Sequence, residues 1–122
     1  MIDSTILIDY LRGRNSAIGL IEQLREQAPL HGSEITRVEI LAGMRPTEEI
    51  PTRAVLSGLF WHPIDSEIAE RAGALGRQWL PSHSGIDAAD LAIAATAQIL
   101  GLPLYTSNIR HFPMFPGLQP PY

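Results

Sequence analysis

Four acidic residues occupy positions from which their side chains could share one site. Asp3 follows a short apolar stub at the amino terminus, and Glu39 lies one helical turn after an apolar strand. Asp87 and Asp90 open a long apolar segment of small side chains. Carboxylates gathered at one place repel each other strongly unless a cation is present. Oxygen ligands without cysteine suit Mg²⁺ or Mn²⁺ better than zinc.

The chemistry that such a site favours is cleavage or transfer of a phosphate ester. A magnesium ion held by carboxylates usually shares its coordination with substrate phosphates, activates water and stabilises the leaving oxygen. Each acid also has a structural explanation as a helix cap. Thr36 and Glu39 match a capping box, Asp87 and Asp90 nearly match one, and Asp3 can cap the first helix. Asp90 would then be a surplus acid in an apolar neighbourhood.

The composition limits the class of protein. The 122 residues fit a single domain, expected to span 1–122, with room for a hydrophobic core. There is no cysteine, which excludes disulfides and thiolate metal sites. No membrane span or signal peptide is recognisable, so a cytoplasmic location is expected. The net charge of −4 argues against a general nucleic-acid binder but not against a local basic groove.

Helices and strands are expected to alternate along the chain. The patterns predict helices at 4–13, 15–27, 36–44, 47–59, 65–80 and 87–100, and strands at 29–35, 59–64 and 102–107. The proline-rich tail can hold an edge position at most. This alternation predicts a mainly parallel sheet of four to five strands covered by helices on both faces. Ligands of such sheets bind beyond the carboxyl ends of the strands, where the acids are expected.

Three blocks of the sequence, in this order, resemble the PIN-domain ribonucleases of the VapC toxin type. They are "DSTILIDYLRG", "SEITRVEILAG" and "DAADLAIAATAQILGLPLYTSNIRHF", of which the third is the most specific. The resemblance covers nearly the whole chain. It implies a compact three-layer α/β/α fold and metal-dependent endoribonuclease activity, with Mg²⁺ or Mn²⁺ held by acidic residues. It also implies an RNA substrate, a cognate VapB-type antitoxin and a homodimer.

The resemblance assigns roles to the four acids. By motif, Asp3, Glu39 and Asp90 match catalytic acids of the family, and Asp87 falls where some members have a further acid. Asp3, Asp87 and Asp90 are expected to hold the metal.

Four further residues are expected to support the site: Thr5, Thr106, Asn108 and His111. Thr106 and Asn108 match the family's T-x-N after the last strand. The chain departs from the family pattern in two places. Only two residues precede Asp3, where relatives have a fuller strand, and His111 stands where many relatives carry another acid. Asp87 could supply that missing charge.

Two other interpretations stay open on the residues alone. One is an α/β domain that binds Mg²⁺ in an acidic pocket for phosphoryl transfer. It would require a lysine after the last strand, and the chain has no lysine. The other is a non-catalytic interaction module whose acids only cap helices.

His31, His62 and His83 lack ligand spacing and are expected at the surface or at strand ends.

Overall fold

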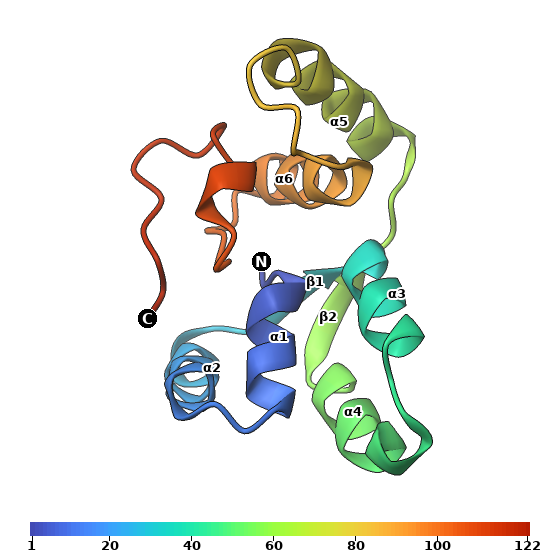
Figure 1. Ribbon diagram of the computed structural model, residues 1–122, viewed down its shortest axis with the longest axis vertical. Helices are drawn as coiled ribbons and strands as arrows, with labels where there is room; N and C mark the ends of the chain where they lie inside the picture. The colour runs from blue at the N-terminus through green and yellow to red at the C-terminus, as the bar shows by residue number, and fades with distance from the viewer.

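A computed structural model describes all 122 residues. The helices are α1 (Ser4–Leu11), α2 (Asn15–Gln27), α3 (Glu34–Ala42), α4 (Glu49–Leu56), α5 (Ser66–Trp79) and α6 (Ala88–Leu100). The strands are β1 (Leu30–Ser33) and β2 (Leu59–His62), and the short 3₁₀ helices are η1 (Pro46–Glu48) and η2 (Ile109–His111). Figure 1 shows their arrangement. None of the helices combines the length and the apolar character needed to cross a bilayer.

Four extended segments lie side by side in the centre of the molecule. β1 pairs with β2 in parallel, with Leu30 opposite Leu59. On the other side of β1, the Ile2 N–H donates to the His31 carbonyl (2.8 Å), and Ile2 forms a parallel bridge with Tyr105. The order across the sheet is therefore Tyr105, Ile2, β1 and β2. The chain changes direction across the sheet between Ile2 and Tyr105, and such a switch point is where doubly wound folds bind ligands.

The expected α/β architecture with a parallel sheet is confirmed, but only β1 and β2 form a continuous ladder, where four to five strands were predicted. Residues 102–107, expected to be the clearest strand, contribute only the bridge at Tyr105. Their neighbour in the sheet is the short amino-terminal segment that ends at Asp3, where α1 follows at once. Pro103 has no N–H to donate, which limits the ladder further. The tail beyond η2 forms no strand, in line with its proline content.

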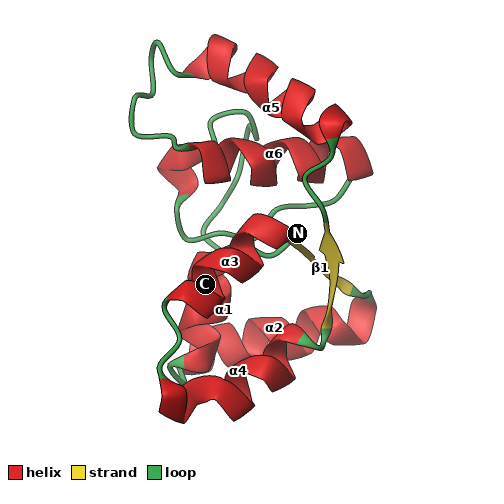
Figure 2. Cartoon of the chain, turned by 90° about the vertical axis from the view of Figure 1, so that its right-hand side faces the viewer, coloured by secondary structure: helices red, strands yellow, loops and turns green.

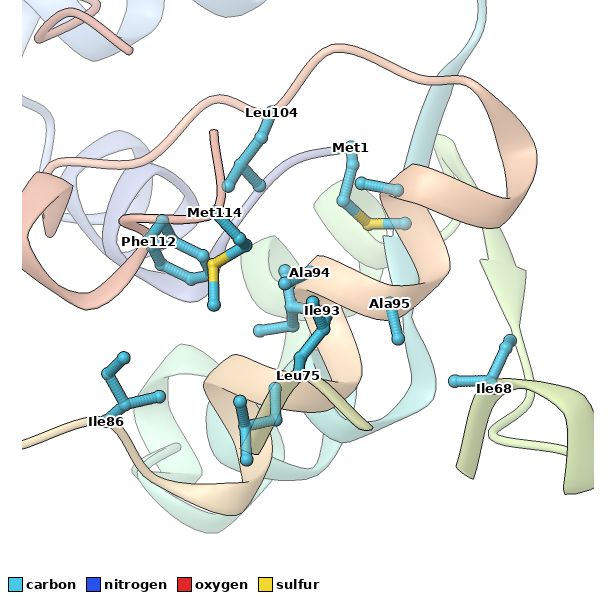
Figure 3. Close-up of a cluster of buried hydrophobic side chains, with 12 residues drawn as sticks. Met1, Ile68, Leu75, Ile86, Ile93, Ala94, Ala95, Leu104, Phe112 and Met114 are labelled. Carbon is cyan, nitrogen blue, oxygen red and sulfur yellow. The ribbon is translucent and has the colours of Figure 1, made fainter. Parts of the chain in front are cut away.

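The extended segments carry side chains to two separate cores. Successive residues of a strand point to opposite faces. Met1 and Leu104 belong to one buried cluster, and Ile2 and Leu30 belong to the other. The first cluster lies between the sheet and the pair α5 and α6, and Figure 3 shows Met1, Leu104 and Phe112 around α6. The second packs against α1, α2 and α4, so that helices cover both faces (Figure 2).

Helix α6 is the most deeply buried element. Every residue from Asp90 to Ala97 is buried, and the helix packs against α5 and α3. Its small side chains allow this close approach from several sides. The helix ends at Gly101, which has a left-handed φ of 65°. The sequence predicted this end from the glycine. The buried part of the helix fixes the position of its first turn. This turn contains Asp90 and follows the N-cap residue Asp87.

Ser33 caps α3, and the prediction that Thr36 does so is wrong. The Ser33 side chain accepts a hydrogen bond from the Ile35 N–H (3.3 Å), and the helix begins at Glu34. Thr36 therefore lies inside the helix, where its hydroxyl is fully buried without a hydrogen-bond partner. Glu39 is not the glutamate of a capping box, and its carboxylate has no capping role.

A side chain at position 32 would collide with Trp61. An ideal Cβ on Gly32 would lie 2.5 Å from Cζ3 of that ring, which is held by a hydrogen bond from Nε1 to the Leu56 carbonyl (2.8 Å). Gly32→Ala is expected to lower the free energy of unfolding by about 1–3 kcal/mol in a denaturant titration. The control is Gly19→Ala in α2, where no atom lies within 4 Å. That change should raise stability by roughly 0.5–1 kcal/mol. Equal stability of the two variants would contradict the packing described.

Candidate active site

Asp3 lies at the carboxyl end of the first extended segment, beside the switch point of the sheet. It is only 3% exposed. Its Oδ2 accepts hydrogen bonds from the hydroxyls of Thr106 (2.7 Å) and Thr5 (3.2 Å). These hydroxyls in turn accept hydrogen bonds from the N–H groups of Asn108 (2.9 Å) and Ser107 (3.1 Å). The backbone after the last extended segment therefore fixes the direction of the Asp3 carboxylate.

Asp87 and Asp90 form a reciprocal capping box at the start of α6. The Asp90 N–H donates to Oδ1 of Asp87 (2.8 Å), and the Asp87 N–H donates to Oδ2 of Asp90 (3.2 Å). The capping interpretation of this pair is therefore confirmed. It does not exclude a role as metal ligands, because a carboxylate offers about four lone pairs. Asp90 is 8% exposed, whereas Asp87 is open to solvent.

His111 in η2 contacts the same acid. Its Nδ1 lies 3.0 Å from Oδ2 of Asp90 and 3.3 Å from the side-chain nitrogen of Asn108. An ionised carboxylate only accepts hydrogen bonds, so this contact assigns the proton of the ring to Nδ1. The opposite nitrogen, Nε2, is directed toward Gly85, where a Cβ would lie 3.8 Å away. The two predicted supporting residues Asn108 and His111 thus lie together beside Asp90.

The four acids are close enough for the charge of one to affect the pKa of another. Burial raises the pKa of Asp3, and the charge of Asp87 adds to the effect. The pKa of Glu39 is raised first by the partial desolvation of its carboxylate and then by the charges of Asp3, Asp87 and Asp90, and the nearby Ser4 hydroxyl acts in the opposite direction. Burial raises the pKa of Asp90 to about 6, and the charge of Asp87 contributes in the same direction. Acids from the starts of α1 and α6 and from the body of α3 therefore act on one another.

The donor set fits a hard divalent cation. Its members are carboxylates, the chain has no cysteine, and only one histidine contacts the group. The mutual repulsion that adds to the effect of burial on these pKa values would be relieved by a bound positive charge. No three of the side chains already surround a single ion position. Glu39 is exposed on α3, and its flexible side chain can adjust to an ion held by Asp3, Asp87 and Asp90.

The arrangement of fold and acids agrees with a known family. A family model described as PIN domain matches residues 1–114. The chain belongs to the PIN domain family. This result confirms the resemblance seen in the three sequence blocks.

The comparisons place this PIN domain close to VapC proteins. Ribonuclease VapC19 of Mycobacterium tuberculosis is 44% identical over 123 residues, which cover 100% of this chain and 98% of that protein. Ribonuclease VapC10 of the same species is 38% identical over 122 residues, which cover 100% and 92%. A solved toxin–antitoxin complex from Klebsiella pneumoniae contains a chain with 34% identity and a TM-score of 0.79, over 99% of this chain and 96% of that one.

Ser4 is a further polar residue beside the acids. It is buried in the first turn of α1, and its hydroxyl lies close enough to Glu39 to counter part of the rise in the pKa of that carboxyl. Its position directly after Asp3 was the only available signal. By contrast, His31 and His62 form a pair outside the acid group, with 2.8 Å between Nδ1 and Nε2. The parallel register of β1 and β2 creates this pair.

The metal-free PIN domain is expected to lose stability as the pH rises from about 4 to about 6. In this window Asp90 keeps its proton in the folded state, where its pKa is about 6, but loses it in the unfolded chain. The folded state then binds more protons, so the free energy of unfolding falls as the pH rises. The raised pKa values of Asp3 and Glu39 act in the same direction.

Thermal melts in chelator at pH 4, 5 and 6 measure this effect. Asp90→Asn lacks the titrating group, so the Tm of the variant minus the Tm of the wild type should increase as the pH rises. Each kcal/mol corresponds to about 4 °C in a domain of this size. Parallel Tm curves for the two proteins would show that Asp90 ionises normally.

Proposed function

We propose that this PIN domain is a metal-dependent endoribonuclease that acts as the toxin of a toxin–antitoxin pair. The observation that carries the proposal is the convergence of Asp3, Glu39, Asp87 and Asp90 at the switch point of the sheet. The raised pKa values of Asp3, Glu39 and Asp90, and the repulsion among the carboxylates, are the properties expected of a site that binds a cation. The names of the VapC relatives as ribonucleases support RNA as the substrate.

The proposed cofactor is Mg²⁺ or Mn²⁺, held by Asp3, Asp87 and Asp90. When bound, such an ion would activate water and stabilise the charge that develops on the leaving oxygen. Asp3 is suited to fix its position, because two hydroxyls orient the carboxylate and the surrounding protein excludes solvent. Asp87 and Asp90 are suited to the same task because the buried body of α6 holds them.

Glu39 has a different environment and therefore a different proposed role. Its side chain is exposed, makes no capping contact and carries a raised pKa. A carboxylate with a raised pKa accepts a proton more readily, which suits a base that orients or deprotonates the attacking water.

The alternative of a non-catalytic domain is supported only by the capping box of Asp87 and Asp90. The other two acids do not fit it. Asp3 occupies the N-cap position of α1, but its side chain makes no capping hydrogen bond. Glu39 lies beyond the first turn of α3, whose cap is Ser33. A pure capping role therefore does not explain why a carboxylate is buried at Asp3, where its desolvation costs free energy.

The proposed partner is a VapB-type antitoxin, and the proposed assembly includes a homodimer of this chain. The solved relative from Klebsiella pneumoniae is a toxin–antitoxin complex, which supports such a partner here. An acid cluster attracts a guanidinium group, because an arginine fork binds a carboxylate through two charge-assisted hydrogen bonds. An antitoxin segment carrying arginine could therefore block the acids and inhibit cleavage.

Asp90→Asn is expected to abolish RNA cleavage while the protein stays folded. The amide retains an oxygen for the capping box but loses the charge that a metal requires. Cleavage of single-stranded RNA with Mn²⁺ should fall by roughly 100-fold or more, beyond the 10–100-fold typical of residues that only support a ligand. Circular dichroism provides the folding control. Full Mn²⁺-dependent cleavage by the folded variant would refute the assignment of Asp90.

Thr106→Val is expected to weaken metal binding without removing a ligand. The buried Thr106 hydroxyl donates to Asp3 over 2.7 Å, and valine has the same shape without the donor. The Mn²⁺ concentration for half-maximal cleavage should rise about 10–100-fold, with activity regained at high Mn²⁺. Thr106→Ser keeps the hydroxyl and serves as the matched control. An unchanged Mn²⁺ requirement in the valine variant would show that Thr106 does not position Asp3.

A further inference from the structure

We propose that a hollow beside η2 binds a phosphate of the RNA backbone, with Arg110 as its principal contact. This inference rests on the proposed ribonuclease function and extends it to the path of the substrate. The hollow has a volume of about 260 Å³ and is lined by His83, Gly85, Ile86, Arg110 and His111. None of these residues is acidic.

The hollow adjoins the acid cluster through one shared side chain. His111 places Nδ1 3.0 Å from Asp90 and directs Nε2 to the Gly85 side of the ring, which lines the hollow. A single imidazole therefore separates the carboxylates from the hollow. An RNA strand with one phosphate at the acids would bring a neighbouring phosphate to this place.

Arg110 is free to bind a ligand. Its guanidinium is exposed and makes no ion pair or side-chain hydrogen bond within the protein. In contrast, Arg14, Arg37 and Arg53 are each paired with a carboxylate of their own neighbourhood. An unpaired guanidinium presents a planar fork of N–H donors that matches the oxygens of a phosphate.

His83 adds a second polar group on a fixed support. Its Nδ1 lies 2.8 Å from the Ser82 hydroxyl, and its ring packs edge-on against Trp79 at 5.7 Å between centroids. The hollow has free space beside Gly85, because a Cβ at this position would meet only Nε2 of His111, at 3.8 Å. The hollow therefore combines room for a phosphodiester with nitrogen groups along its edges.

A second hollow beside the acids is less suited to a phosphate. It has a volume of about 150 Å³ and contains Arg12, but Glu39 and Glu48 line it as well. Two carboxylates repel a phosphate, and one cation among them does not reverse the local charge. The backbone of a nucleic acid is therefore expected at Arg110 rather than at Arg12.

Arg110→Ala tests the proposal through the salt dependence of RNA binding. A labelled single-stranded RNA is titrated with the full chain in chelator, which prevents cleavage, from 50 to 200 mM salt. Losing one phosphate contact should reduce the slope of log K against log salt by about 0.7. The affinity lost relative to wild type should then be roughly threefold greater at 50 than at 200 mM. In Mn²⁺-dependent cleavage, KM should rise while kcat stays near that of the wild type.

Arg25→Ala is the control for net charge. Arg25 is an exposed arginine near the end of α2, before the amino end of β1 and so at the opposite end of the sheet from the acids. Its salt slope and KM should equal those of the wild type. Gly85→Asp provides a second variant that keeps Arg110 and adds a carboxylate to the hollow. It should weaken RNA binding and raise KM at least as much as Arg110→Ala.

Inorganic phosphate is the competitor that separates a phosphodiester site from a site for the free ion. Phosphate should displace RNA from the wild type at lower concentration than from Arg110→Ala. Phosphate binding that depends on Arg110, with RNA binding unchanged in the variant, would overturn the proposal in favour of a free-phosphate site.

Other results would also overturn it. If Arg110→Ala and Gly85→Asp both keep the salt slope and KM of the wild type, the RNA backbone does not pass through the hollow. A change confined to the preferred cleavage sequence would assign Arg110 to a base, and a change confined to antitoxin binding would assign the surface to that partner. Absence of Mn²⁺-dependent cleavage by the wild type would reject the ribonuclease function itself. If the wild type cleaves RNA and Arg110→Ala has the same salt slope and KM as the wild type, only the proposed phosphate contact is rejected.

Discussion

Repulsion among carboxylates is the constraint on which this structure depends. Asp3, Asp87, Asp90 and Glu39 lie within electrostatic reach of each other, and burial of Asp3 and Asp90 strengthens their interaction. Such a group can persist only if rigid elements hold it together. The buried helix α6 fixes two acids, and the hydroxyls of Thr106 and Thr5 fix a third. The fold therefore stores an electrostatic cost that a cation would remove.

Structural and chemical roles coincide at the start of α6. The capping box of Asp87 and Asp90 satisfies two backbone N–H groups that would otherwise lack partners. The same bonds hold both carboxylates in one orientation, which a metal site also requires. Capping and ligation therefore support each other here. Glu39 shows the opposite case, because its helix is capped by Ser33 and its side chain is left for another purpose.

A polar network links the two ends of the chain at the site. It joins Asp3 to the Thr106 hydroxyl and that hydroxyl to the backbone N–H of Asn108, and beside it Nδ1 of His111 contacts Asp90. The contact of His111 with Asp90 offsets negative charge at the site. The imidazole also forms the boundary between the acids and the hollow with Arg110. This contact thus changes the charge balance on one side of the site.

The sequence by itself determined the features that depend on neighbouring residues. Alternating apolar patterns indicated the α/β class, small side chains indicated the buried α6, and Gly101 indicated its end, because these signals act within a few residues. The three sequence blocks indicated the family and the acids. Only the tertiary structure decided how far the strands pair, which residue caps α3 and which groups surround each acid. The Ser4–Glu39 contact, the His31–His62 pair and the unpaired Arg110 all depend on segments distant in sequence. Register and charge between such segments are set by packing, and no local pattern encodes them.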